Sequence, residues 1–140
     1  FDLIARYFTR AAKRAALGVG DDCALLAALP AGQQLAISCD MLVEGRHFLP
    51  GAPADSVGHQ ALAVNLSDLA AMGAEPAWAL LSLSLPEPDE SWLEAFASGL
   101  YALAQSHGVA LVGGDTVRGP RVVTVTALGF VEPGRALRRD

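Results

Sequence analysis

The sequence has 140 residues and a formal net charge of −5, with 52% hydrophobic and 18% charged residues. A chain of this length can enclose one hydrophobic core, and its composition is too apolar for a disordered segment. The acidic balance argues against nucleic acid as a partner, because nucleic-acid-binding domains usually carry a basic stripe. No stretch approaches the roughly 18 consecutive apolar residues of a membrane span.

Signals of location and processing are sparse. The two cysteines, Cys23 and Cys39, form no CxxC motif. One disulfide between them is conceivable, but two thiols in a domain of this size are more typical of a reduced, cytoplasmic protein. Residues 1–8 do not resemble a signal peptide. The chain lacks an initiator methionine and ends abruptly at Asp140, which indicates a fragment.

Apolar periodicity and turn residues predict the elements of the N-terminal third. In the first of them, Phe1, Ile4 and Phe8 share one face of a short helix. In chain order we expect a helix over residues 1–8, a loop over 11–16, a turn over 18–22, a strand over 23–29, a turn over 30–32, a strand over 35–39 that ends at Asp40, and an extended segment over 41–48.

The remaining elements are longer and better delimited. Helix caps and stops follow from Asp and Ser before apolar runs and from Gly after them. In chain order we expect a helix capped by Asp55 or Ser56 that ends at Gly73, a strand over 77–85, a helix opened by Asp89 or Ser91 that ends at Gly108, a short strand over 109–112 leading into Gly113-Gly114-Asp115, and a strand over 122–131.

This order of elements predicts the fold class. Strict β-α-β alternation fails early in the chain, so a doubly wound parallel fold is disfavoured. We expect an α+β domain with a mixed sheet and helices packed on one of its faces. No internal repeat or low-complexity segment divides the chain, so residues 1–140 are interpreted as one domain.

The acidic residues are distinguished by their positions beside apolar runs rather than among lysines. Asp21 and Asp22 precede a predicted strand, Asp40 ends one, and Asp115 follows one through two glycines. Each has an ordinary alternative as a turn or cap residue. Asp68 is different, because an acid within a helix of Ala, Leu and Val requires a partner.

A cluster of these carboxylates would need a cation. Two like charges about 4 Å apart repel by roughly 4 kcal/mol at an effective dielectric constant near 20. Oxygen ligands without His or Cys partners favour Mg²⁺ over Zn²⁺. Magnesium commonly shares its coordination shell with phosphate oxygens, so the pattern indicates a nucleotide ligand.

Other catalytic motifs are missing or weak. No glycine is followed by Lys-Ser or Lys-Thr, so there is no Walker loop, and residues 18–20 lack the third glycine of a dinucleotide fingerprint. No nucleophile–His–acid arrangement is visible, and His59 and His107 are interpreted as surface or helix-end residues.

Five segments in order resemble the signatures of thiamine-monophosphate kinases. The likeness extends over nearly the whole chain, and its value lies in the conjunction of the segments. They are residues 18–26 with Gly18-Val19-Gly20-Asp21-Asp22, residues 38–48, residues 61–74 with Asn65-Leu66-Ser67-Asp68, residues 111–120 with Gly113-Gly114-Asp115, and residues 134–139.

The resemblance implies an N-terminal domain of the aminoimidazole-ribonucleotide synthetase type that binds ATP and Mg²⁺ and pairs through its sheet into a homodimer. A C-terminal domain, absent from this chain, would complete the active site. The implied residues are Asp22, Ser38, Cys39, Asp40, Asp68 and Asp115 for several magnesium ions, Gly114, Asp115 and Arg139 for ATP, and His47 for thiamine monophosphate. Cys39 stands where the family usually has Thr, and a neutral thiol is a poor magnesium ligand. Its backbone carbonyl or a water molecule would have to take that role.

The implied activity is ATP-dependent phosphorylation of thiamine monophosphate to thiamine diphosphate, by direct transfer and without a general base. Three alternatives stay open from the sequence. They are a sister enzyme such as a selenophosphate synthetase or a hydrogenase maturation factor, a non-catalytic Mg-nucleotide-binding module, and a structural dimerisation domain.

Overall fold

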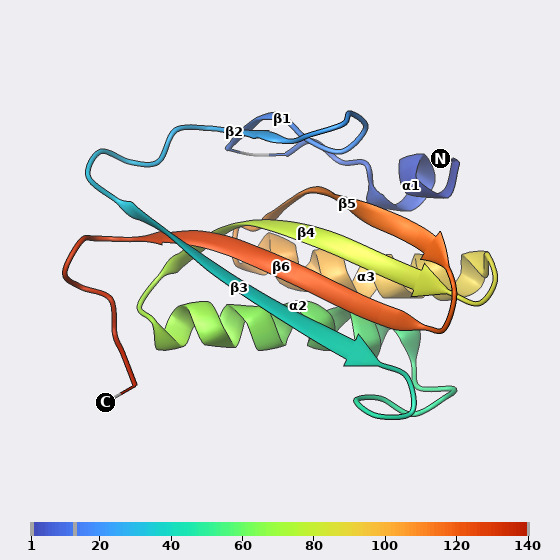
Figure 1. The fold of residues 1–140 in the computed structure, drawn as a ribbon. Helices are drawn as coiled ribbons and strands as arrows, with labels where there is room; N and C mark the ends of the chain where they lie inside the picture. The colour runs from blue at the N-terminus through green and yellow to red at the C-terminus, as the bar shows by residue number, and fades with distance from the viewer. Residues whose placement is uncertain (1, 13, 140) are drawn as a thin grey trace.

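The structure, a computed structural model, describes residues 2–12 and 14–139. The described part of the chain forms three helices and six strands (Figure 1). In chain order they are α1 (Asp2–Phe8), β1 (Ala15–Leu17), β2 (Leu25–Leu26), β3 (Gln34–Val43), α2 (Ala54–Ala71), β4 (Glu75–Leu85), α3 (Glu90–Ser106), β5 (Ala110–Arg118) and β6 (Val122–Val131). Phe1, which was expected on the first helix, lies outside the described residues.

Four strands form one mixed sheet in the order β3-β6-β4-β5. β6 is antiparallel to both of its neighbours, whereas β4 and β5 run parallel. α2 and α3 cover one face of this sheet, and the small β1–β2 hairpin lies over the other face (Figure 1). The predicted α+β class, with helices on one face of a mixed sheet, is therefore confirmed.

Alternation along the strands separates two apolar layers. In β4, Leu81, Leu83 and Leu85 are buried in the core between the sheet and the helices. Trp78, which precedes them at an even position, belongs to a second cluster beneath the hairpin. Because successive side chains point to opposite faces of a strand, from Trp78 onward the odd positions of β4 face the helices and the even positions face the hairpin.

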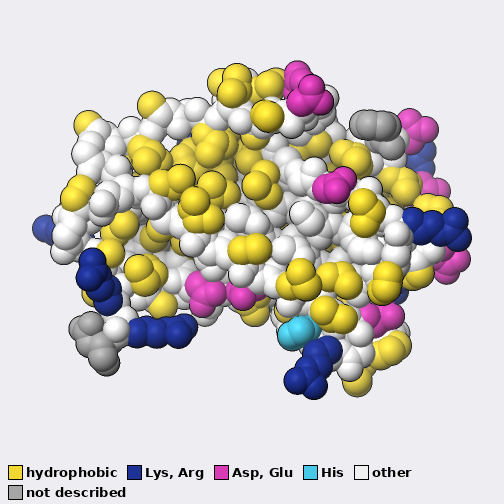
Figure 2. Space-filling model, in the orientation of Figure 1, with side chains coloured by type: hydrophobic (Ala, Val, Ile, Leu, Met, Phe, Trp, Pro, Cys, Tyr) yellow, Lys and Arg dark blue, Asp and Glu magenta, His cyan; other side chains and the backbone are white. Residues whose placement is uncertain are grey.

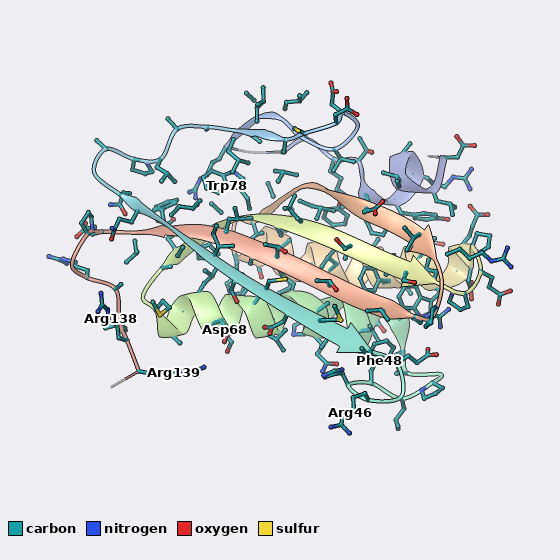
Figure 3. The ribbon with its side chains drawn as sticks, viewed as in Figure 1. Arg46, Phe48, Asp68, Trp78, Arg138 and Arg139 are labelled. Atoms are coloured by element: carbon teal, nitrogen blue, oxygen red, sulfur yellow. The ribbon has the colours of Figure 1, made fainter. Side chains whose placement is uncertain are left out.

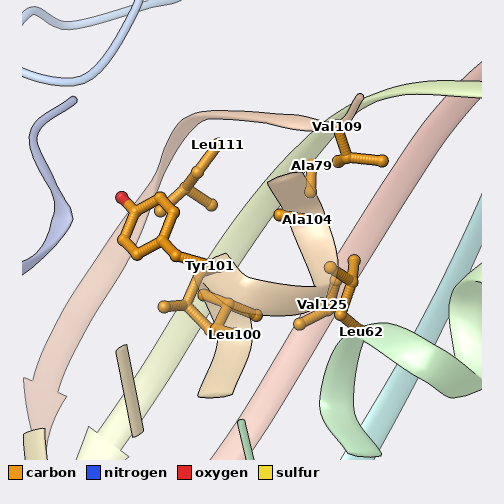
Figure 4. A pocket seen from close by; sticks show the side chains of 9 residues that line it. Leu62, Ala79, Leu100, Tyr101, Ala104, Val109, Leu111 and Val125 are labelled. Carbon is orange, nitrogen blue, oxygen red and sulfur yellow. The ribbon is translucent and has the colours of Figure 1, made fainter. Parts of the chain in front are cut away.

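The helix-side core is almost completely filled. A cavity of only about 10 Å³ remains between α3 and the sheet, lined by apolar side chains that include Leu62 and Val125 (Figure 4). Its size suits no more than a single water molecule. Tyr101 also lines it, with its hydroxyl turned away from the other side chains, and burial raises the pKa of Tyr101 to about 12. This cavity is a packing defect and not a ligand site.

Two glycines let α2 and α3 pack with their backbones in contact. A Cβ atom on Gly99 would lie 1.9 Å from the Asp55 carbonyl oxygen, and one on Gly58 would lie 2.2 Å from the Phe96 carbonyl oxygen. Real Cβ atoms do not approach backbone oxygen this closely, so any other residue at either position would force the helices apart.

The helix ends agree with the sequence in most places. The Asp89 side chain, one of the two residues expected to open this helix, accepts a hydrogen bond from the Trp92 amide at 3.1 Å and caps α3. Gly73 and Gly108 follow the C-termini with φ of 73° and 67°. The cap of α2 was wrong: Pro53 occupies that position, and its carbonyl accepts from the Val57 amide. None of the described helices has the length and apolar character needed to cross a bilayer.

The strand boundaries differ more from prediction. β1 lies partly within the expected loop over residues 11–16, and β2 is only two residues long. β3 continues beyond Asp40 to Val43, because its last residues pair with the start of β6. β5 continues through the two glycines to Arg118, because residues 113–118 pair with β4.

Candidate functional site

One acidic group lies where edge strand β3 packs against α2. Ser38 and Asp40 alternate with Leu42 along β3, and Leu42 belongs to the helix-side core. Ser38 and Asp40 therefore face α2. The Ser38 hydroxyl donates a hydrogen bond to Asp68 Oδ2 at 3.1 Å. Figure 3 shows Asp68 on α2 beside β3. Three of the residues expected to bind magnesium are thus brought together.

The electrostatics of this group favour a cation. Burial raises the pKa of the Asp40 carboxyl, and hydrogen bonding with Asp68 and the negative charge of Asp68 raise it further. Two carboxylates in this arrangement resist full ionisation until a positive charge neutralises them. The Ser38 hydroxyl and the two carboxylates supply oxygen atoms only, which are the ligands that Mg²⁺ prefers. The residues present therefore fit a magnesium ion.

Asn65 is a polar residue of this region to which the sequence analysis gave no role. It is completely buried one turn before Asp68 on α2. Its Nδ2 donates to the Ala61 carbonyl at 3.2 Å, whereas Oδ1 has no partner among the described residues. A buried amide oxygen without a partner is unfavourable by about 1–3 kcal/mol. The sequence signal was an amide within residues 61–66, where every other residue is apolar.

A second group lies on the opposite face, beneath the β1–β2 hairpin. A pocket of about 710 Å³ opens there, lined by Asp21 and Asp22 of the hairpin and by Gly113, Gly114 and Asp115 of β5. Its volume is in the range of ligand sites. The structure thus brings together the first and fourth sequence signatures, about ninety residues apart.

Gly114 is required by the path of β5. It has φ of 147°, and a Cβ atom on it would lie 1.7 Å from the Leu81 carbonyl oxygen. Only glycine fits such a close approach of β5 to β4. Because neither glycine has a side chain, the backbone next to the Asp115 carboxylate is accessible, and a phosphate group could approach that backbone.

One carbonyl group joins the two strands of the hairpin to each other and to the sheet, beside the apolar contacts that the hairpin makes with Trp78 and Phe130. The Arg14 carbonyl accepts hydrogen bonds from the Trp78 indole at 2.9 Å and from the Ala27 amide at 2.7 Å. Trp78 comes from β4 and lies between the hairpin and the sheet (Figure 3). Arg14 has φ of 62°, an uncommon value for a residue other than glycine. This junction fixes the segment that carries Asp21 and Asp22.

Trp78→Phe should loosen the hairpin without disturbing the helix layer. The variant keeps an aromatic ring but loses the indole donor, which contributes about 1 kcal/mol. We expect the Ala27 amide to exchange its hydrogen faster by roughly fivefold, as that free energy implies, while α2 and α3 exchange unchanged. Hydrogen exchange followed by mass spectrometry measures both. Unchanged exchange at residues 25–28 would show that the indole bond does not hold the hairpin.

The other expected site residues lie in three different places. Cys39 is exposed on the face opposite Ser38, where Thr126 donates to its Sγ at 3.4 Å, so its thiol points away from Asp68. His47 is exposed in the loop after β3, and its Nδ1 accepts from the Val43 amide at 2.9 Å. Nδ1 therefore carries no proton in this arrangement, and Nε2 presents a donor outward. Arg139 lies on the C-terminal tail, on the side of the molecule where α2 carries Asp68 (Figure 3).

The expected ligands do not converge in one place within this chain. Among residues 2–12 and 14–139, no three His, Cys, Asp or Glu side chains lie close enough to hold a metal ion together. The expectation of one pocket for all the acids is corrected to two groups, Asp40 with Asp68 and Asp22 with Asp115. The pleat of the sheet explains this division. Asp115 pairs with Ser82, whose side chain points to the face opposite the helices, whereas Asp40 faces the helices.

Residues 20–131 match the family described as AIR synthase related protein, N-terminal domain. The chain belongs to this family. It is 54% identical to thiamine-monophosphate kinase of Salmonella typhimurium over 143 residues, which is 100% of the chain and 44% of that protein. It also matches the crystal structure of thiamine-monophosphate kinase from Stenotrophomonas maltophilia K279a, with 52% identity and a TM-score of 0.85 over 99% of this chain and 43% of that one.

A further solved structure is that of AaThiL complexed with AMPPCP and TMP. It is 34% identical, with a TM-score of 0.70 over 75% of this chain and 35% of that one. The chain therefore spans less than half the length of the relatives that it matches. Both acidic groups, including Asp22, Asp40, Asp68 and Asp115, lie within the residues that match the family.

Proposed function

We propose that this chain is the N-terminal ATP- and magnesium-binding domain of a thiamine-monophosphate kinase. The observation that supports the proposal most directly is the contact between Ser38 and Asp68 beside Asp40, which brings two separate signatures together as a set of oxygen ligands suited to a cation. The 54% identity to a thiamine-monophosphate kinase supports the substrate. The complex of AaThiL with an ATP analogue and TMP supports the same pair of ligands.

The reaction requires positioning and charge neutralisation more than proton transfer. A terminal oxygen of the thiamine monophosphate phosphate bonds to the γ-phosphorus of ATP, while the bond from that phosphorus to the bridging oxygen breaks and ADP leaves. The acceptor oxygen is already anionic near neutral pH, so no general base is needed. Bound magnesium would neutralise charge on the phosphates and align them.

Each residue has a defined part in this proposal. Asp40, Asp68 and Ser38 would hold cations through side-chain oxygens, and Cys39 would contribute only its backbone carbonyl or a bound water. Asp22 and Asp115 would hold the metal–nucleotide across the hairpin pocket, with Gly114 presenting its backbone. Arg139 contacts the ATP phosphates, and His47 contacts thiamine monophosphate through Nε2.

A homodimer formed through the sheet face opposite α2 and α3 is part of the proposal. This face exposes large apolar side chains, among them Ile37 at 61%, Met41 at 57% and Val117 at 53% exposure. Figure 2 shows yellow apolar groups spread over the side of the molecule that the helices do not cover. Exposed apolar patches of this kind mark association surfaces. We further propose a cytoplasmic location for the enzyme.

The test is an assay of ADP release by the full-length protein with thiamine, thiamine monophosphate and other phosphate esters as acceptors. We expect turnover with thiamine monophosphate and Mg-ATP, and thiamine diphosphate as the product. Turnover confined to another acceptor would assign a sister enzyme. ATP binding without turnover would leave a nucleotide-binding module, and no shift in melting temperature with Mg-ATP would favour a structural domain.

His47→Ala should raise the KM for thiamine monophosphate about tenfold, with little change in the KM for ATP, because it removes one outward donor. Steady-state kinetics with each substrate varied in turn measures both constants. His59→Ala on α2, an exposed histidine away from the loop, is the matched control and should leave both constants unchanged. An effect of His47→Ala confined to ATP would contradict the assignment.

A further inference from the structure

Arg121 lies at the end of the domain where β3 ends and α3 begins. It follows the turn after β5 and precedes β6. Its side chain is only 14% exposed, which is low for an arginine. Its Nε atom is buried and has no hydrogen-bond partner among the described residues. A positive charge held in this position is unfavourable unless its contacts compensate it.

The first contact of Arg121 is with Glu44, the first residue of the loop after β3. The guanidinium Nη1 lies 3.4 Å from Glu44 Oε2. The Glu44 amide also donates to the Arg121 carbonyl at 3.1 Å. Arg121 therefore holds the backbone and the side chain of Glu44 together.

The second contact is with α3. The guanidinium carbon lies 4.5 Å from the centre of the Trp92 ring, in a cation–π arrangement. Trp92 in turn stacks on Phe96 of the main core, with ring centres 4.9 Å apart. Arg121 also acts on Asp89, the cap of α3. Hydrogen bonds from the Trp92 amide and from Ser91 lower the pKa of Asp89, and the positive charge of Arg121 lowers it further.

The loop that begins at Glu44 has internal hydrogen bonds, and the His47 ring is also tied to the end of β3, where its Nδ1 accepts from the Val43 amide at 2.9 Å. The Gly45 amide donates to the Phe48 carbonyl at 2.7 Å, and the His47 amide donates to the Val43 carbonyl at 2.8 Å. Phe48 packs on the main core, whereas Arg46 points away from the domain (Figure 3). His47 is thus carried by a tight turn that Phe48 anchors at one end.

We infer that Arg121 is a positioning residue for thiamine monophosphate, which fixes the Glu44 end of this loop to α3 and so holds His47 in place. The inference rests on the proposed function of His47. A planar guanidinium can stack on Trp92 and pair with Glu44 at the same time, which an ammonium group does less well. Because Arg121 is not within the loop, we expect its effect to reach the substrate through Glu44.

Arg121→Met in the full-length protein keeps the aliphatic stem and removes the charge. We expect a KM for thiamine monophosphate raised roughly tenfold, with the KM for ATP changed less than about twofold. Glu44→Gln should shift the same constant in the same direction by a smaller factor. The double variant should raise the KM for thiamine monophosphate no further than Arg121→Met alone, because both substitutions break the same contact between Arg121 and Glu44.

Arg6→Met is the matched control. Arg6 pairs with Glu90 at the start of α3, but the side chains of both Arg6 and Glu90 are more than half exposed, so the same substitution there should leave both KM values unchanged. Arg121→Lys is the replacement test variant if Arg121→Met fails to fold. It retains the charge for Glu44 but weakens the stacking on Trp92, and a rise in the KM for thiamine monophosphate of roughly threefold is expected.

Hydrogen exchange separates a failure of this inference from a failure of the proposed function. In Arg121→Met or Arg121→Lys, peptides covering residues 43–48 should exchange roughly tenfold faster while α2 is unchanged, whatever the substrate. Faster exchange without a change in the KM for thiamine monophosphate overturns the substrate role. Unchanged exchange, or an equal rise in both KM values, overturns the positioning role itself. Loss of thiamine monophosphate turnover in the unmodified protein would instead overturn the proposed function.

Discussion

Asp68→Asn should reduce kcat by roughly 100-fold or more at saturating magnesium, a loss typical of removing one group that stabilises charge in a transition state. The substitution keeps the acceptor oxygen for the Ser38 hydroxyl but removes the charge that binds the cation. Asp68 is exposed, so we expect the fold to survive. Steady-state kinetics and circular dichroism measure the two quantities. Near-normal turnover would remove the main support for the proposed function.

The same variant should change how stability depends on pH without magnesium. Burial and Asp68 raise the pKa of Asp40 above its usual value, so the folded state holds this proton more tightly than the unfolded chain. The free energy of unfolding should therefore fall as pH rises from the usual range of aspartic acid through the raised value. Asp68→Asn removes part of the cause, and the fall should be smaller.

Magnesium provides the control for that measurement. A cation bound between the two carboxylates favours their ionised forms, so added Mg²⁺ should flatten the pH dependence of the unmodified protein. It should have little effect on the stability of Asp68→Asn in the same pH range. An equal response of the two proteins to Mg²⁺ would show that Asp40 and Asp68 do not share an ion.

Gly99→Ala should lower the free energy of unfolding of the domain by about 2–4 kcal/mol. The new methyl group would lie 1.9 Å from the Asp55 carbonyl oxygen, and neither backbone can move without separating α2 from α3. Alanine favours a helix by about 1 kcal/mol relative to glycine, which offsets only part of this loss. Chemical denaturation followed by the fluorescence of Trp78 and Trp92 measures the change.

Ser98→Ala is the matched control for this substitution. Ser98 is the neighbouring residue on α3 and is exposed, so alanine there should leave stability unchanged or raise it by a few tenths of a kcal/mol. Gly58→Ala should resemble Gly99→Ala, because its methyl group would lie 2.2 Å from the Phe96 carbonyl oxygen. A neutral Gly99→Ala would mean that the two helices can separate at no cost.

Apart from the cap of α2, the helix ends were predictable from the sequence because local chemistry determines them. The cap at Asp89 and the helix ends at Gly73 and Gly108 depend on residues within one turn, and all three were found. The extensions of β3 and β5 were missed, because they depend on pairing with β6 and β4. A strand with two adjacent glycines has no local signal that it continues.

Prediction of the candidate site also succeeded for local features and failed for contacts between distant residues. Family signatures identified Asp40 and Asp68, but only the packing of α2 on β3 brings Ser38 to Asp68, thirty residues away in sequence. The role of Arg121 depends on Glu44 and on Trp92, neither of which is near it in the chain. An arginine in a turn looks like any other solvated residue until those contacts are known.

The position of the two acidic groups at opposite edges of the sheet has an electrical consequence. β3 and β5 are separated by three strand spacings, roughly 14 Å, which exceeds the Debye length of about 8 Å at physiological ionic strength. Within one chain, a cation at Asp40 and Asp68 would therefore repel a cation at Asp115 only weakly. Each group would gain or lose a cation with little effect on the other, and the losses in cation affinity from substituting both groups should add.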